Sequence, residues 1–201
     1  MRYGMVIDLR RCIGCYGCHI ACKAENCTPP AMLWSRVHYY EWGTYPATRR
    51  LALPVLCMHC GEPPCEKACP TGATYRRPDG IVVVDSGKCL GCGSCVIACP
   101  YRARSLNSKP RGYFPGQGLT PYEEFGYKRH PAGVVEKCDF CLSRVEKGLE
   151  PACVVGCLPK ARHFGDLDDP HSQVAQLITR RRGFQISPEL GTDPSVYYLP
   201  P

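Results

Sequence analysis

Cysteine is the residue type with the most ordered spacing in this 201-residue sequence, which contains seventeen of them. Sixteen fall into four groups of four, and every group ends in a Cys-x-x-x-Cys step. The groups are Cys12, Cys15, Cys18, Cys22; Cys57, Cys60, Cys65, Cys69; Cys89, Cys92, Cys95, Cys99; and Cys138, Cys141, Cys153, Cys157. Thiolates at this spacing are ligands of iron–sulfur centres. The pattern predicts electron-transfer chemistry.

The geometry of a cubane explains the spacing. A C-x2-C-x2-C loop wraps one face of the cubane, so that its three thiolates meet three irons. In bacterial two-cluster ferredoxins the fourth cysteine of the run binds the neighbouring cluster, and two runs therefore cross-ligate a pair of [4Fe-4S] centres. Four groups predict two such pairs, with iron bound in four [4Fe-4S] clusters through all sixteen cysteines.

Disulfides and zinc are the alternative roles for so many cysteines. Cysteines two residues apart are a strained choice for bridging one another, and we expect no secretory signal before the first group. Zinc ribbons show C-x2-C doublets separated by a spacer, whereas the first and third groups are uninterrupted runs of four. Both alternatives are less consistent with the spacing than iron–sulfur ligation.

The net charge of the protein becomes much less positive when the charge of the bound clusters is included. The formal charge of +7 treats every cysteine as neutral. A [4Fe-4S] centre with four thiolates carries roughly −2, so four centres bring the holoprotein to about −1. The excess of Lys and Arg is therefore internal counter-charge, and we expect no nucleic-acid partner.

Two prolines indicate which groups pair. Cys69 and Cys99 are each followed by proline, as in two-cluster ferredoxins, whereas Cys22 and Cys157 are not. Groups two and three then form an inner unit, residues 57–100, inserted into an outer unit of groups one and four, residues 1–56 and 101–201. Pairing of group one with two and three with four is the alternative. The nested ligand sets are Cys12, Cys15, Cys18, Cys157 (centre A); Cys22, Cys138, Cys141, Cys153 (centre B); Cys57, Cys60, Cys65, Cys99 (centre C); and Cys69, Cys89, Cys92, Cys95 (centre D).

Short strands and helices must position these loops, so we expect an α+β fold of two nested ferredoxin-like units with long loops. Residues 5–8 read as a strand before the first ligand loop, and 19–25 as a short helix that includes Cys22. The same order recurs before Cys57 and Cys89. Residues 74–76 and 81–84 predict a hairpin around the turn Pro78-Asp79-Gly80. A C-terminal helix is expected from His171 to about Arg182, with Asp169 as N-cap and Pro170 at its first position.

Several features lie outside the ligand pattern. Residues 106–136 form a long insertion without a clear period, which we interpret as a loop that docks a partner. Trp34, Trp42, Tyr39 and Tyr40 are candidates for interface or for sheet packing. Cys27 is expected to be a non-ligand thiol. His59 is expected to be an exposed loop residue, the alternative being a hydrogen-bond donor to a cluster sulfur.

These motifs resemble the electron-transfer subunit of the dimethyl-sulfoxide-reductase family of molybdopterin oxidoreductases. The resemblance extends from Met5 to about Asp169. It includes M-V-I-D-L at 5–9, C-E-K-A-C-P-T-G at 65–72, C-D-F-C-L-S-R-V-E-K-G-L-E-P-A at 138–152 and F-G-D-L-D-D-P at 164–170. Some family members replace one cysteine of group three with tryptophan and bind a three-iron centre, but this sequence retains all four. Leu158-Pro159 shifts a family proline by one residue.

The resemblance implies a relay between a quinol-handling membrane partner and a catalytic subunit with a molybdenum or tungsten pterin cofactor, in anaerobic respiration. The sequence has no nucleophile elbow, phosphate loop or supported carboxylate pair, so we expect a non-catalytic subunit. A relay for a formate dehydrogenase or hydrogenase, or a free polyferredoxin, are the alternatives. No run of 18 apolar residues predicts a transmembrane segment. The family implies a complex at the periplasmic face of the membrane, with the cytoplasm as the alternative.

Removal of iron is expected to unfold most of the chain. Gly and Pro are abundant, at twenty residues each, and the clusters replace part of the apolar core. Ligand binding is then coupled to folding. Circular dichroism before and after anaerobic iron chelation tests this expectation, and a native-like spectrum of the apoprotein would contradict it.

Overall fold

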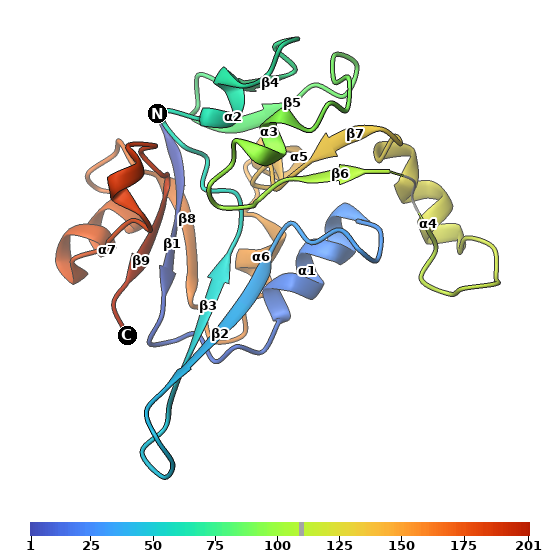
Figure 1. Ribbon diagram of the computed structural model, residues 1–201. Coiled ribbons are helices and arrows are strands. Elements are labelled where there is room, and N and C mark those ends of the chain that lie inside the picture. The colour runs from blue at the N-terminus through green and yellow to red at the C-terminus, as the bar shows by residue number, and fades with distance from the viewer. Residues whose placement is uncertain (109–110) are drawn as a thin grey trace.

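A three-stranded sheet lies at one side of the chain in the computed structural model, which describes residues 1–108 and 111–201. Its order is β8 (Arg162–Asp166), β1 (Tyr3–Asp8), β9 (Val196–Leu199), with β8 antiparallel and β9 parallel to β1. Met5, Val6 and Ile7 of the central strand are fully buried. Figure 1 shows α7 (Gln173–Arg181) beside this sheet, where Val174 packs on Val6 and Leu199. The predicted strand at 5–8 is confirmed and begins two residues earlier.

A strand, a ligand loop and a short helix follow one another at each cysteine group. The pairs of strand and helix are β1 with α1 (Gly17–Asn26), β3 (Arg49–Val55) with α2 (Pro64–Lys67), β5 (Val82–Val84) with α3 (Ser94–Ile97), and β7 (Val134–Glu136) with α5 (Leu142–Val145) and α6 (Ala152–Val155). The helices α2 and α3 are short because Pro70 and Pro100 follow their last cysteines closely and cannot continue a helix. The expected helix at 19–25 is confirmed as part of α1.

Three two-stranded antiparallel ribbons complete the β structure of the described residues. The strands β4 (Thr74–Arg76) and β5 pair in the register Thr74↔Val84, which confirms the predicted hairpin. The strand β2 (Arg36–Trp42) pairs with β3, and this long hairpin extends away from the rest of the chain (Figure 1). The strand β6 (Ser105–Asn107) pairs with β7 and thereby closes the base of the 106–136 insertion. The fold is α+β with short elements, as expected.

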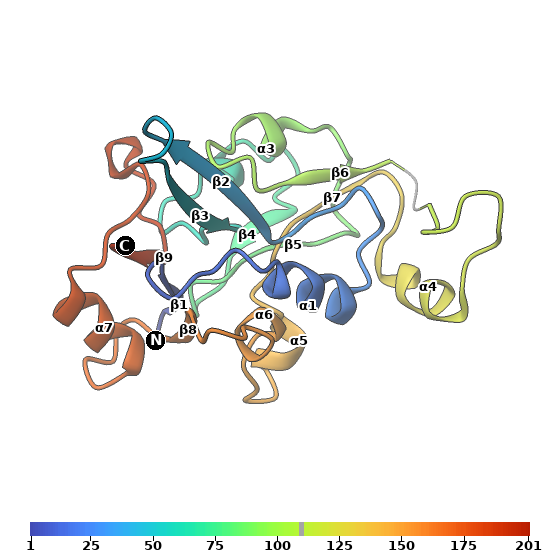
Figure 2. The ribbon, with the colours of Figure 1, turned by 90° about the horizontal axis from the view of Figure 1, so that it is seen from below.

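The insertion is more ordered than its sequence suggested. It contains α4 (Pro121–Gly126) and the 3-10 turn η1 (Tyr127–Arg129), and it ends in β7. Thr120 and Glu123 form a reciprocal capping box before α4. The expectation of a patternless loop was wrong because a single short helix with a capping signal has no visible period. Residues 109–110 of the insertion lie outside the described residues, and Figure 2 shows the α4 segment projecting from the body.

The start of the C-terminal helix also differs from the prediction. Ser172, not Asp169, is the N-cap, and its Oγ accepts a hydrogen bond from the Ala175 N–H at 3.2 Å. Asp169 instead accepts from the His171 N–H at 2.8 Å, in a turn that precedes the helix. Asp-Pro therefore begins a turn here, and the helix starts three residues after the proline. The 3-10 turn η2 (Pro188–Leu190) follows α7.

Ser172→Ala is expected to weaken the first turn of α7. Loss of an N-cap side chain costs about 1 kcal/mol, which corresponds to roughly fivefold faster exchange of the protected amides. Hydrogen exchange by mass spectrometry over 172–181 measures this change. Asp169→Ala is the matched control, and a larger effect of that variant would restore Asp169 as the cap.

Candidate iron–sulfur sites

Two cavities are each lined by four cysteines from different parts of the chain. One contains Cys69, Cys89, Cys92 and Cys95, which brings the last cysteine of group two to group three. The other contains Cys12, Cys15, Cys18 and Cys157, which brings the last cysteine of group four to group one. These are the sets predicted for centres D and A. Cys15 and Cys92 are exposed, so both cavities reach the protein surface.

A third set gathers Cys22 with Cys138, Cys141 and Cys153, and all four side chains are buried. Burial, followed by repulsion from the Cys153 and Cys141 thiolates, raises the pKa of Cys22 far above its ordinary value. Burial also raises the pKa of Cys138, with Cys22 as the strongest repelling thiolate. Bare thiols in this position would stay protonated, and a bound cation is needed to hold them as thiolates.

The fourth set joins groups two and three. Burial raises the pKa of Cys60 to about 12, and the thiolates of Cys57, Cys65 and Cys99 add to this effect. Cys99 lies beside group two although it ends group three in the sequence, as the cross-ligated arrangement requires. The structure thus places cysteines of group four beside group one, and cysteines of group three beside group two. That each of the four sets binds a cluster stays a prediction.

Several ligand sulfurs accept hydrogen bonds from backbone N–H groups, as thiolates that bind an iron–sulfur cluster do. Backbone N–H groups of Thr74, Val135, Phe140 and Ala161 point at ligand sulfurs over 3.4, 3.5, 3.5 and 3.2 Å. None of the seventeen cysteines forms a disulfide in the structure. Among the described residues, no three His, Cys, Asp or Glu side chains are placed to hold a single metal ion. A cubane differs from such a site because each cysteine binds its own iron.

The second residue between the first two cysteines of each group has a left-handed backbone. These residues are Gly14, His59, Gly91 and Phe140, with φ of 70°, 44°, 67° and 57°. Glycine adopts this conformation without strain, whereas bulky residues rarely do. At Gly14 an added Cβ would lie 2.2 Å from the Tyr39 hydroxyl, and at Gly91 it would lie 2.0 Å from the Gly133 carbonyl oxygen. The left-handed backbone of His59 and Phe140 therefore needs a structural reason.

His59 and Phe140 provide that reason by stacking on each other. Their ring centroids are 3.7 Å apart, and both side chains are buried. The expectation that His59 is exposed was wrong, because the loop that contains it faces the group-four loop rather than solvent. His59 Nδ1 accepts a hydrogen bond from the Val82 N–H at 3.1 Å, and Nε2 has no hydrogen-bond partner within the described residues. The stack fills the space between the loops of centres B and C.

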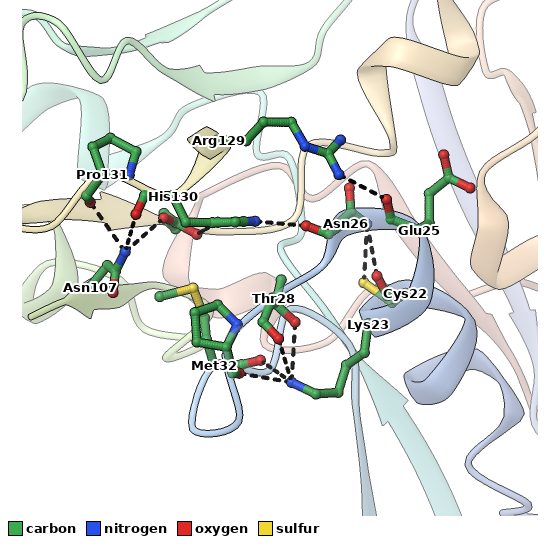
Figure 3. Close-up of polar contacts among 12 residues, drawn as sticks. Cys22, Lys23, Glu25, Asn26, Thr28, Met32, Asn107, Arg129, His130 and Pro131 are labelled. Atoms are coloured by element: carbon green, nitrogen blue, oxygen red, sulfur yellow. Dashed lines mark hydrogen bonds and ion pairs between the residues drawn. The ribbon is translucent and has the colours of Figure 1, made fainter. Parts of the chain in front are cut away.

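A buried polar network connects the insertion to the loop of centre B (Figure 3). Asn26 donates from Nδ2 toward the sulfur of Cys22 at 3.6 Å. The same Nδ2 lies 3.8 Å from the sulfur of Cys141. His130 Nε2 donates to the Asn26 carbonyl oxygen at 2.7 Å, and His130 Nδ1 lies 2.6 Å from Glu136 Oε2. Burial lowers the pKa of His130, but the two acceptors outweigh burial and raise it. The insertion is therefore held at its base by an imidazolium–carboxylate pair.

Lys23 holds the last turn of α1 against the segment that follows this helix. Its Nζ donates to the carbonyl oxygens of Thr28, Pro29 and Met32 at 2.9 to 3.2 Å (Figure 3). Cys27 lies in the same turn, and its thiol contacts the Tyr122 carbonyl oxygen of α4 at 3.5 Å rather than a ligand set. That Cys27 binds no iron stays a prediction.

The aromatic candidates divide between packing and exposure. Trp34 is half-buried against the main core, and Tyr39 donates from its hydroxyl to the Gly14 carbonyl oxygen at 2.5 Å. Tyr40 and Trp42 are 53% and 49% exposed on β2. Trp34 and Tyr39 therefore pack within the chain, and the two exposed rings are left as contact candidates.

Two buried arginines are functional candidates that the spacing argument missed. Arg104 and Arg162 are 5% and 3% exposed, and each guanidinium lies among ligand cysteines. Burial lowers the pKa of Arg162, but the thiolates of Cys153 and Cys18 outweigh burial and raise it. Each arginine stands five residues after the last cysteine of a group, and this repeated distance was visible in the sequence.

Comparison with known proteins identifies the family of this chain. The family of 4Fe-4S dicluster domains matches residues 48–114 and 110–167. A relative assigned as a dimethyl sulfoxide reductase iron-sulfur subunit in Halobacterium salinarum is 45% identical over 98% of this chain and 78% of its own length. The chain belongs to the iron–sulfur subunits of the dimethyl-sulfoxide-reductase family.

Two further relatives cover nearly all of this iron–sulfur subunit. The arsenate respiratory reductase iron-sulfur subunit of Shewanella is 39% identical over 99% of this chain and 96% of its own length. A subunit of tetrathionate reductase from Salmonella typhimurium is 43% identical over 98% of this chain and 72% of its own length. The chain is thus an iron–sulfur electron-transfer subunit that carries [4Fe-4S] clusters. None of its described helices has the length and apolar character of a membrane span.

His130→Leu is expected to loosen the insertion of this iron–sulfur subunit. The substitution leaves the Glu136 carboxylate buried without its partner, which costs about 3 kcal/mol or more. Limited trypsin digestion of the holoprotein measures cleavage at Arg111, Lys128 and Arg129. The double variant His130→Leu/Glu136→Leu should recover part of the resistance.

A surface pair provides the control for this experiment. Arg50 and Glu41 form an exposed ion pair on the β2–β3 hairpin, and its loss costs about 0 to 1 kcal/mol. Glu41→Gln should leave the cleavage of the insertion unchanged. Equal cleavage of the His130→Leu variant and the wild type would show that the buried pair does not hold the insertion.

Proposed function

We propose that this subunit relays electrons through four [4Fe-4S] clusters, with the ligand sets given for centres A to D. The observation that supports this most directly is the gathering of cysteines from distant groups, such as Cys157 with group one and Cys99 with group two. Thiol side chains free of disulfides and N–H groups aimed at sulfur fit cubanes at these positions.

The same placements support two nested units rather than two successive ones. Cys22 is surrounded by cysteines of group four, so centre B joins the ends of the outer unit. Residues 57–100 then form the inner unit, and residues 1–56 with 101–201 form the outer unit. The alternative pairing of group one with two would require Cys22 to lie among group-two cysteines.

The exposure of the cysteines suggests an order for the relay. Centres A and D reach the surface at Cys15 and Cys92, whereas the ligands of centre B are buried. The His59–Phe140 stack lies between the loops of B and C, and Cys153 of B lies near Cys18 of A. We infer the order A–B–C–D, with exchange of electrons with partners at both ends.

We propose two partners for these ends: a molybdopterin catalytic subunit and a quinol-handling membrane subunit, in an anaerobic respiratory reductase at the periplasmic face. The chain itself is then non-catalytic. Relatives that are named as subunits match it almost end to end, which favours a docked subunit over a free polyferredoxin. In a formate dehydrogenase or a hydrogenase, electrons would pass through the same clusters in the opposite direction.

The insertion is the surface that we assign to the catalytic partner. It exposes a series of large apolar side chains although its base is firmly held by the His130–Glu136 pair. The exposed residues are Tyr113, Phe114, Leu119, Tyr122 and Phe125, the last at 72% exposure. Aromatic side chains on a projecting segment are typical of protein interfaces.

Elemental analysis of the anaerobically purified native complex tests this function. Four cubanes predict about sixteen irons per copy of this chain, together with molybdenum or tungsten from the catalytic partner. Nickel with iron would indicate a hydrogenase instead, and iron alone would indicate a free carrier. Zinc without iron would overturn the cluster assignment.

A further inference from the structure

The chain contains a short repeat after the last cysteine of groups three and four. It reads Cys99-Pro-Tyr-Arg-Ala-Arg104 in one unit and Cys157-Leu-Pro-Lys-Ala-Arg162 in the other. The fourth residue of each copy has a left-handed backbone, with φ of 48° at Arg102 and 51° at Lys160. Its N–H donates to the cysteine carbonyl oxygen at 3.1 and 3.0 Å, respectively. Both copies therefore form the same turn, and each delivers its last arginine into the interior.

Arg104 lies between centres C and D. Its Nη2 donates to Cys65 Sγ at 3.0 Å, and its Nη1 donates to Thr74 Oγ1 at 2.9 Å. The guanidinium also interacts electrostatically with Cys57 of centre C and Cys95 of centre D. One side chain therefore faces thiolates of both centres in the inner unit.

Arg162 has the equivalent place between centres A and B. It lines the cavity of centre A and interacts electrostatically with Cys12 and Cys18. It also attracts the thiolates of Cys22 and Cys153, which belong to centre B. The outer unit thus has one guanidinium facing both of its centres, as the inner unit does.

The remaining contacts of the two arginines are with neutral groups. Thr74 accepts from Arg104, while the Ser35 hydroxyl accepts from Arg162 at 3.1 Å and Met5 Sδ lies at 3.7 Å. Within residues 1–108 and 111–201, neither guanidinium pairs with a carboxylate. A buried charge without a partner is costly, so the thiolates supply the compensating charge.

We propose that Arg104 and Arg162 are equivalent positioning residues, each of which holds a fixed positive charge between the two clusters of one unit and raises the reduction potentials of both. This inference rests on the proposed ligand sets. Arginine remains protonated at all working pH values. Its charge favours the reduced form of each neighbouring cluster, because reduction adds a negative charge in a poorly solvated interior. It also lessens the repulsion between two reduced clusters.

Redox titrations of the purified holoprotein, followed by electron paramagnetic resonance, test the proposal. Arg104→Gln removes the charge and leaves a shorter side chain with a neutral N–H donor, whereas Arg104→Met removes both the charge and the donor. Each should shift the reduction equilibria of centres C and D at least tenfold toward the oxidised form, which is about 59 mV for one electron. Centres A and B should not move. Arg162→Gln and Arg162→Met should give the reverse pattern.

Charge-retaining and surface variants complete the design. Arg104→Lys and Arg162→Lys should recover most of the wild-type potentials because the charge is kept. Arg102→Gln removes an exposed charge from the same turn, two residues before Arg104, and should leave all four potentials unchanged because solvent screens it.

The possible failures can be told apart. Unchanged potentials in variants that retain about sixteen irons, or a shift confined to one centre, would overturn the proposal and leave the relay function intact. A shift of A with C, rather than of C with D, would overturn the ligand sets instead. Fewer than four clusters in the wild-type protein would contradict the proposed function itself.

Discussion

The burial of many thiolates in a small chain is the physical constraint on which this structure depends. Ten of the proposed ligand cysteines are buried, and burial raises the pKa of several of them strongly. Such sulfurs are stable as ligands only when cations and donors surround them. Iron supplies most of the positive charge, and backbone N–H groups, the two guanidiniums and the buried Lys137 near Cys65 add to it. The excess of Lys and Arg in the sequence is partly explained in this way.

The repeated strand–loop–helix order follows from the same constraint. A ligand loop must curl tightly enough for consecutive thiolates to meet one cluster, and this demands left-handed residues at fixed places. The flanking strand and the short helix hold the two ends of each loop. Because the clusters occupy the centre, the helices do not need long apolar faces, and most of them are only four residues long. Helices this short are stable through tertiary packing rather than through helix propensity.

The sequence predicted the strand before the first group and the 74–84 hairpin, because these depend on local patterns. The ligand sets were inferred from the prolines after Cys69 and Cys99 and stay a prediction. What the sequence did not reveal depends on contacts between distant segments. His59 was expected to be exposed, yet its burial comes from a partner 81 positions later in the chain, Phe140. The helix in the insertion was missed because α4 has only six residues, too few for a period. The Thr120–Glu123 capping box was nevertheless a visible signal. Arg104 and Arg162 were missed because charged residues are usually exposed, and their burial depends on the turns that follow Cys99 and Cys157.

The two units are related by their repeats but differ where they meet. The left-handed residue between the first two cysteines is glycine in centres A and D. The Tyr39 side chain lies directly against the first of these glycines and the Gly133 backbone against the second, so neither position has room for a side chain. Centres B and C have Phe140 and His59 at the same position, and these rings face each other across the junction. Both rings are buried, and the low dielectric of a buried apolar space strengthens the electrostatic effect of each nearby charge. In the proposed relay, glycine thus stands at this repeated position in the two end centres, and an aromatic ring stands there in the two central centres.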